Sequence, residues 1–287
     1  MLRFKQVDVF TTRPFFGNPV AVVLEADRLD TAAMQRIAAW TNLSETTFVL
    51  RPTVPAADYR LRIFTPRSEL PFAGHPTIGT AHAVIEAGIV ADKPELRQEC
   101  AAGVLRLTID GAGRERSIAV EVPPAALAPI PADARPAIEQ ALGAPLARDA
   151  VIVSVGPRWL TVMLADAVAV RALAPDFGAI AAVSRHLGAT GITVFALADG
   201  GDHDVVVRSF APADGVPEDP VCGSGNAAVG AWLDHAGVRV GEAGRYRASQ
   251  GRELGRDGYV SVRIDPTTRR VWIGGAAVTC LDGVLRE

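Results

Sequence analysis

The chain has 287 residues, of which 49% are hydrophobic and 21% are charged, and its formal net charge is −3. This composition is typical of a globular protein with a sizeable core, and the length suits one large domain or two ordinary ones. The weakly acidic balance excludes the basic surface that nucleic-acid binding requires.

The first residues, MLRFKQVD, interleave polar and apolar side chains as a strand does, and no apolar run is long enough to span a membrane. We therefore expect a cytoplasmic protein without membrane partners. The three cysteines and five histidines are scattered, without the spacing of a disulfide framework or a metal site. We expect reduced thiols and no bound metal.

The first predicted helix covers residues 31–41, with Asp30 as its N-cap and Asn42 near its end. A strand is expected around residues 47–50. Glu45 lies in the short joint between this helix and this strand, where a carboxylate is either a capping or solvated group or a functional one.

A half-buried strand follows at residues 59–63, where apolar and charged side chains alternate. Residues 76–87 are small or apolar on most faces, which predicts a buried helix. Alternation at residues 105–109 before two glycines indicates a hairpin. The Pro- and Ala-rich residues 123–136 show neither pattern and are the natural linker.

The same order of motifs occurs twice. The paired segments are RIFTP at 62–66 with RSFAP at 208–212, and AGHPTIG at 73–79 with CGSGNAA at 222–228. Phe64 and Phe210 lie 146 positions apart, and the offset becomes 149 at Glu69 and Glu218. A second buried helix is expected at 225–236, and a second hairpin strand at 260–264.

The repeat predicts an α/β (α+β) fold of two pseudo-symmetric domains. Each would be a mainly antiparallel curled sheet or barrel around a central helix. The expected domains are residues 1–124 and 125–287, with the last strand free to cross back to the first domain.

The two buried helices begin at matching Gly-rich motifs, with Pro76 suited to the first helical position and Ser224 to the N-cap. If the halves face each other across a pseudo-twofold axis, both helix N-termini would offer amide donors to an anion such as a carboxylate. Each motif alone also fits a tight turn. A dinucleotide-binding interpretation fails, because Glu218-Asp-Pro220 stands where an apolar strand should lead in.

Glu45 has no acidic counterpart in the repeat, because an offset of 146 leads to Gly191. Whatever chemistry a carboxylate performs at this position therefore belongs to the first half alone.

Five motifs taken together resemble the PhzF-like isomerases of phenazine biosynthesis. They are VDVF at 7–10, FGNPVAVV at 16–23, NLSETTF at 42–48, FAGHPT at 72–77 and EDPVCGSG at 218–225. The resemblance implies the diaminopimelate-epimerase type of fold, a homodimer, an active site between the two halves and catalysis without a cofactor.

The resemblance also implies roles for individual residues. It makes Glu45 the general acid/base and adds His75 and Asp219 as catalytic residues. It assigns binding of the substrate carboxylate to Gly74, Gly223, Ser224 and Gly225. The implied reaction moves a proton on a small cyclic or unsaturated carboxylic acid, similar to trans-2,3-dihydro-3-hydroxyanthranilate. Considered alone, His75 would also fit a structural histidine and Asp219 a turn residue.

Cys222 departs from the pattern, since the phenazine enzymes are expected to have threonine there. A cysteine at this position would suit an amino-acid racemase or epimerase, with Glu45 as the second base. Its repeat partner, Ala73, cannot ionise, so a two-thiol mechanism is incomplete. A small buried residue at a helix start is the simpler interpretation of Cys222. A catalytically silent protein that binds a small acid or a partner is the third hypothesis.

Overall fold

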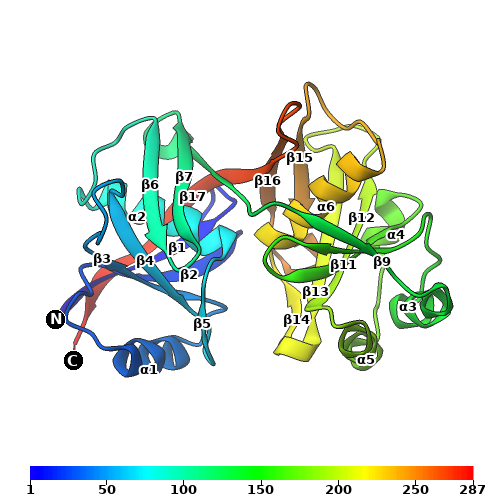
Figure 1. The fold of residues 1–287 in the computed structure, drawn as a ribbon, viewed down its shortest axis with the longest axis horizontal. Coiled ribbons are helices and arrows are strands. Elements are labelled where there is room, and N and C mark those ends of the chain that lie inside the picture. Colours follow the sequence, from blue (N-terminus) through cyan, green and yellow to red (C-terminus); the bar gives the residue numbers. More distant parts are fainter. Residues whose placement is uncertain (287) are drawn as a thin grey trace. The chain divides into compact units, whose positions relative to one another are not determined.

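The computed structural model describes residues 1–286 and divides the chain into two compact units (Figure 1). The first unit comprises Met1–Glu121 and the residues from Gly274 onward, and the second comprises Val122–Ile273. The second unit ends at Ile273, because the last strand continues into the first unit.

The first unit is a closed, mainly antiparallel barrel around a central helix. Its elements are β1 (Leu2–Val9), β2 (Asn18–Val23), α1 (Thr31–Thr41), β3 (Thr46–Leu50), β4 (Tyr59–Phe64), β5 (Glu69–Leu70), α2 (Gly74–Glu86), β6 (Glu95–Cys100), β7 (Gly103–Asp110), β8 (Ser117–Glu121) and most of β17 (Val271–Leu285). β17 pairs with both β1 and β8, which closes the barrel. The parallel neighbours are β2 with β3 and β4 with β6. Helix α2 is buried over nearly its whole length, which explains its small, apolar sequence.

The second unit repeats this plan around α6. Its elements are β9 (Ala126–Pro129), α3 (Arg135–Leu142), β10 (Val151–Ser154), β11 (Arg158–Met163), α4 (Ala167–Arg171), α5 (Phe177–Leu187), β12 (Gly191–Leu197), β13 (Val205–Ala211), β14 (Val216–Asp219), α6 (Gly223–His235), β15 (Arg245–Gln250) and β16 (Gly258–Ile264). The parallel neighbours are β11 with β12 and β13 with β15.

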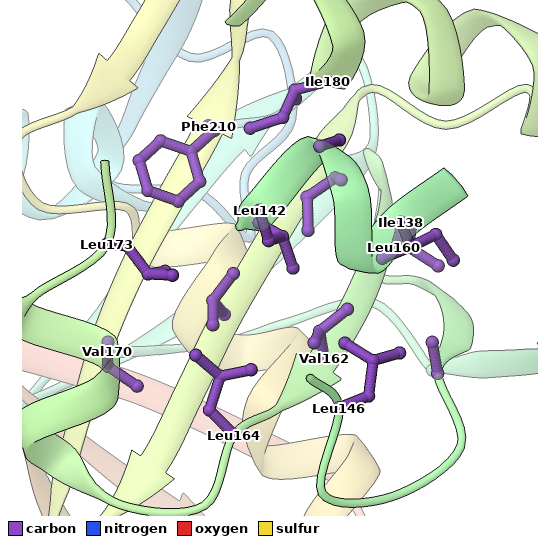
Figure 2. Close-up of a cluster of buried hydrophobic side chains, with 14 of the residues drawn as sticks. Ile138, Leu142, Leu146, Leu160, Val162, Leu164, Val170, Leu173, Ile180 and Phe210 are labelled. Atoms are coloured by element: carbon purple, nitrogen blue, oxygen red, sulfur yellow. The ribbon is translucent and has the colours of Figure 1, made fainter. Parts of the chain in front are cut away.

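The outer helices α3, α4 and α5 cover one face of the second sheet (Figure 2). Leu160 and Val162 of β11 belong to that apolar cluster, together with Phe210 of β13. Successive side chains of a strand point to opposite faces. Trp159 and Thr161 of β11 therefore face away from this cluster, toward α6.

The repeat is visible in strand register and in an ion pair. Thr46 pairs with Phe64, and Ile192 pairs with Phe210, at the same offset. Arg62 binds Glu69 in the first unit, as Arg208 binds Glu218 in the second. The expected fold of two pseudo-symmetric domains, each a sheet around a central helix, is confirmed.

The limits of individual helices and strands agree with some of the predictions and differ from others. The helix at 31–41 has the expected limits, because the Asp30 carboxylate accepts the Ala33 N–H at 2.7 Å and Asn42 is left-handed, with φ 54°. The expected linker 123–136 is instead part of the second unit, since it contains β9, which pairs with β10. Both central helices begin two residues before the expected starts at 76 and 225.

Two further expectations concern the whole described chain. Within residues 1–286, no helix is long and apolar enough to cross a membrane. Cys100, Cys222 and Cys280 form no disulfide with one another.

Candidate active site

Glu45 is held at the start of β3 by the end of α1. The left-handed Asn42 ends α1, and the Glu45 carbonyl accepts the Ala21 N–H at 3.3 Å, which extends the parallel pairing of β2 with β3. Its side chain is only 16% exposed. The carboxylate therefore lies in a site with little water.

His75 of α2 brings a ring nitrogen to this carboxylate. Its Nε2 lies 3.3 Å from Glu45 Oε2, although the contact lacks the geometry of a hydrogen bond. Burial raises the pKa of Glu45 to about 7, while a hydrogen bond from Ser44 acts in the opposite direction. Desolvation disfavours the charged form, so this carboxyl group titrates near neutral pH.

The N-terminus of α2 adds amide donors beside this pair. Ala73 is its N-cap and supplies no side-chain acceptor. The first amides of an α-helix have no acceptor within the helix and carry partial positive charge. Gly74 and His75 are the first two residues of α2, so this first half-site combines a proton acceptor with donors for an anion.

The second half-site is the segment from Asp219 to Asn226, which Gln250 holds at both ends. Gln250 Oε1 accepts the Cys222 N–H at 3.1 Å and the Asn226 Nδ2–H at 2.9 Å. Gln250 Nε2 donates to the Asp219 carbonyl at 3.0 Å, and the Asp219 carboxylate accepts the Val221 N–H at 3.0 Å. One amide side chain thus fixes the loop and the first turn of α6.

Cys222, and not Ser224, is the N-cap of α6. Its Sγ accepts the Gly225 N–H at 3.2 Å, and the residue is only 4% exposed. Burial, followed by the nearby Asp219 carboxylate, raises the pKa of the Cys222 thiol well above its ordinary value. The sulfur is therefore a protonated cap at neutral pH, a poor form for a base.

Ser224 lies one residue into α6 and contacts an indole. Trp159 Nε1 donates to Ser224 Oγ at 3.0 Å. The hydroxyls of Thr193 and Ser209 lie 3.1 Å apart beneath the same turn. A Cβ at Gly225 would lie 2.5 Å from the Ser209 oxygen, so this close approach requires glycine.

The structure thus groups the expected residues into two sets, each described within its own unit. Glu45, Gly74 and His75 gather in the first unit, and Asp219, Cys222, Gly223, Ser224 and Gly225 gather in the second. Sequence reasoning missed Trp159 and Gln250. Among residues 1–286, no three His, Cys, Asp or Glu side chains are grouped so as to hold a metal ion.

Comparisons with known proteins agree with this architecture. The family model described as phenazine biosynthesis-like protein matches residues 7–283. The chain is 43% identical to antisense-enhancing sequence 1 of Schizosaccharomyces pombe, covering 98% of this chain and 97% of that protein. It is 37% identical to the trans-2,3-dihydro-3-hydroxyanthranilate isomerase of Pseudomonas aeruginosa, covering 94% and 93%.

Solved structures agree as well. A PhzF-family protein of Bacillus anthracis superposes with a TM-score of 0.86 at 27% identity, covering 99% of both chains. A probable proline racemase from Agrobacterium radiobacter, at 15% identity and a TM-score of 0.65, shares the fold.

The fold is that of the diaminopimelate-epimerase type, and the chain is an isomerase. It belongs to the phenazine biosynthesis-like (PhzF) family.

Proposed function

We propose that the chain moves a proton on a small cyclic or unsaturated carboxylic acid, with Glu45 as general acid/base and without a cofactor. The observation that carries this proposal is the buried Glu45 carboxyl group beside His75, with a pKa raised to about 7. A general base works best when its pKa lies near the operating pH.

The other site residues position the substrate in this proposal. His75 and Asp219 orient groups of the substrate or relay the proton that Glu45 moves. The first turns of α2 and α6, at Gly74, Gly223, Ser224 and Gly225, bind the carboxylate through N–H and O–H donors. We propose a substrate similar to trans-2,3-dihydro-3-hydroxyanthranilate, because a relative at 37% identity is named an isomerase of that compound.

The racemase alternative needs Cys222 as a base, and the contacts of its sulfur oppose that role. Cys222 Sγ accepts the Gly225 N–H, and its pKa is raised, whereas a thiol base needs a lowered one. The homodimer belongs to the same proposal and rests on the family resemblance, while the proposed cytoplasmic location rests on a sequence without an apolar run long enough to span a membrane.

Incubation of the wild-type chain with trans-2,3-dihydro-3-hydroxyanthranilate and a panel of small unsaturated carboxylates tests the proposal. NMR spectra in H₂O and D₂O should reveal an isomerised product, with deuterium at the reprotonated carbon where Glu45 exchanges with solvent. Conversion should proceed equally well after dialysis against EDTA. A chain that neither converts nor exchanges any member of the panel would support the silent-binder hypothesis instead.

A further inference from the structure

The repeat assigns a counterpart to each residue near the two central helices. Ala21 pairs with Thr46 across the parallel strands β2 and β3, and Leu160 pairs with Ile192 across β11 and β12. The residue before each of these four positions is therefore also matched. Val20 and Glu45 of the first unit correspond to Trp159 and Gly191 of the second, and His75 corresponds to Ser224 at the offset of 149.

The counterparts differ in size and in chemical type: the first unit has a small apolar residue and a carboxylate, whereas the second has a large indole and a glycine. A Cβ at Gly191 would lie 2.1 Å from the Phe210 carbonyl oxygen and 2.8 Å from Cζ3 of Trp159. No side chain fits at residue 191, and the indole of Trp159, which is 3% exposed, occupies the adjoining space. In place of the contact between Glu45 and His75, the second unit has a hydrogen bond from Trp159 to Ser224.

The indole of Trp159 determines the hydrogen-bonding role of the Ser224 hydroxyl. An indole N–H donates only, so Ser224 Oγ must accept from Trp159 and direct its own hydrogen elsewhere. The nearest acceptor given by the structure is Cys222 Sγ, at 3.5 Å, a weak acceptor that already receives the Gly225 N–H. The Ser224 O–H therefore remains available to a stronger acceptor on a ligand.

We propose that Trp159 is a positioning residue that fixes Ser224 as a hydrogen-bond donor to the substrate carboxylate. With Gly191 and Trp159 where the first unit has Glu45 and Val20, these two positions of the second unit provide an indole N–H donor and no carboxylate. The turn that contains Ser224 then recognises an anionic oxygen, and Glu45 carries out the proton transfer. The inference rests on the proposed function for the identity of the ligand.

A double-mutant cycle tests this role with anthranilate as the probe. Dissociation constants are measured by calorimetry for wild type, Trp159→Phe, Ser224→Ala and the double variant. Loss of the indole N–H should weaken anthranilate binding roughly 2- to 10-fold, the range for one hydrogen bond, in wild type but less than about 2-fold in the Ser224→Ala background. Anthranilamide, which lacks the carboxylate, should respond little, and exposed Trp40→Phe is the matched control.

Two further readouts separate positioning from packing. In the ligand-free protein, the NMR signal of the Trp159 indole N–H should shift in Ser224→Ala and stay unchanged in Trp40→Phe. During turnover, Trp159→Phe should raise KM while kcat stays within about 2-fold.

Equal losses in both serine backgrounds, an unmoved indole signal, or wild type that does not bind anthranilate would overturn the inference. Coupling in the cycle together with full activity of Glu45→Gln would instead overturn the proposed function and leave the role of Trp159 standing.

Discussion

Glu45 Oε2 lies 3.3 Å from Nε2 of His75, and both side chains are largely buried. Burial raises the pKa of Glu45 to about 7, so the group is close to half-protonated at neutral pH. A carboxyl group in this state is equally able to accept a proton and to return it, which is the requirement for isomerisation by a single base.

The first prediction concerns the pH dependence of catalysis. The base form of Glu45 is the deprotonated one, so kcat/KM should rise as the pH increases through about 7 and level off above it. Initial rates between pH 5 and 9 provide the profile. An acid limb near pH 4.5, the ordinary value for glutamate, would contradict the buried, raised carboxyl group.

The second prediction concerns Cys222. Serine is a good N-cap, so Cys222→Ser should keep kcat/KM within about threefold and keep stability, whereas Cys222→Ala should lose about 0.5–2 kcal/mol through the missing cap. Denaturant unfolding and steady-state rates measure both. Alkylation should leave activity intact, with Cys280→Ser as the control for the other thiols. Inactive Cys222→Ser would revive the racemase hypothesis.

The third prediction concerns His82 in α2, which is 6% exposed and has neither ring nitrogen hydrogen-bonded within the described residues. The pKa of His82 is lowered, chiefly by burial. The nearby Glu86 carboxylate raises this pKa, and the positive charges of Arg116 and Lys5 lower it further. The unfolded chain therefore binds the proton more tightly. The free energy of unfolding should fall by up to about 1.4 kcal/mol per pH unit below 6.5.

Unfolding of His82→Gln at several pH values measures this contribution. The variant should lose that part of the acid dependence, while the exposed His235→Gln should keep it. Identical pH dependence in wild type and His82→Gln would show that His82 is not the group responsible.

The fourth prediction uses the repeat as its own control. Arg208 and Glu218 are each 6% exposed and 2.8 Å apart, and Arg208 also donates to the carbonyls of Val170 and Leu173. Arg208→Met leaves a buried carboxylate unpaired and should cost about 3–5 kcal/mol. Arg62→Met, at the more exposed repeat position, should cost about 0–1 kcal/mol. Similar losses for the two variants in denaturant unfolding would refute the argument from burial.

The sequence predicts features that depend on neighbouring residues. The limits of α1 follow from the Asp30 cap and from Asn42, and the two units follow from the repeated motifs. The sequence favours Ser224 as the cap of α6 because serine is a preferred cap residue and cysteine is not, whereas in the structure the Cys222 side chain accepts the Gly225 N–H.

Contacts between distant residues are harder to predict. The approach of Glu45 to His75 and the hold of Gln250 on the Asp219 loop depend on strand pairing that no local pattern specifies. One signal for Trp159 was present in the sequence. The repeat position of Glu45 is Gly191, where a Cβ would meet the Phe210 carbonyl oxygen and the Trp159 ring.

The most direct test of the account is the Glu45→Gln variant. Glutamine keeps the size and polarity of the side chain but cannot accept a proton. Turnover of a substrate accepted by wild type should fall about 10²- to 10⁴-fold, while the dissociation constant of anthranilate changes less than about threefold. Glu25→Gln, which removes an exposed carboxylate, is the control and should keep full activity. Turnover by Glu45→Gln within a few fold of wild type would show that another group moves the proton.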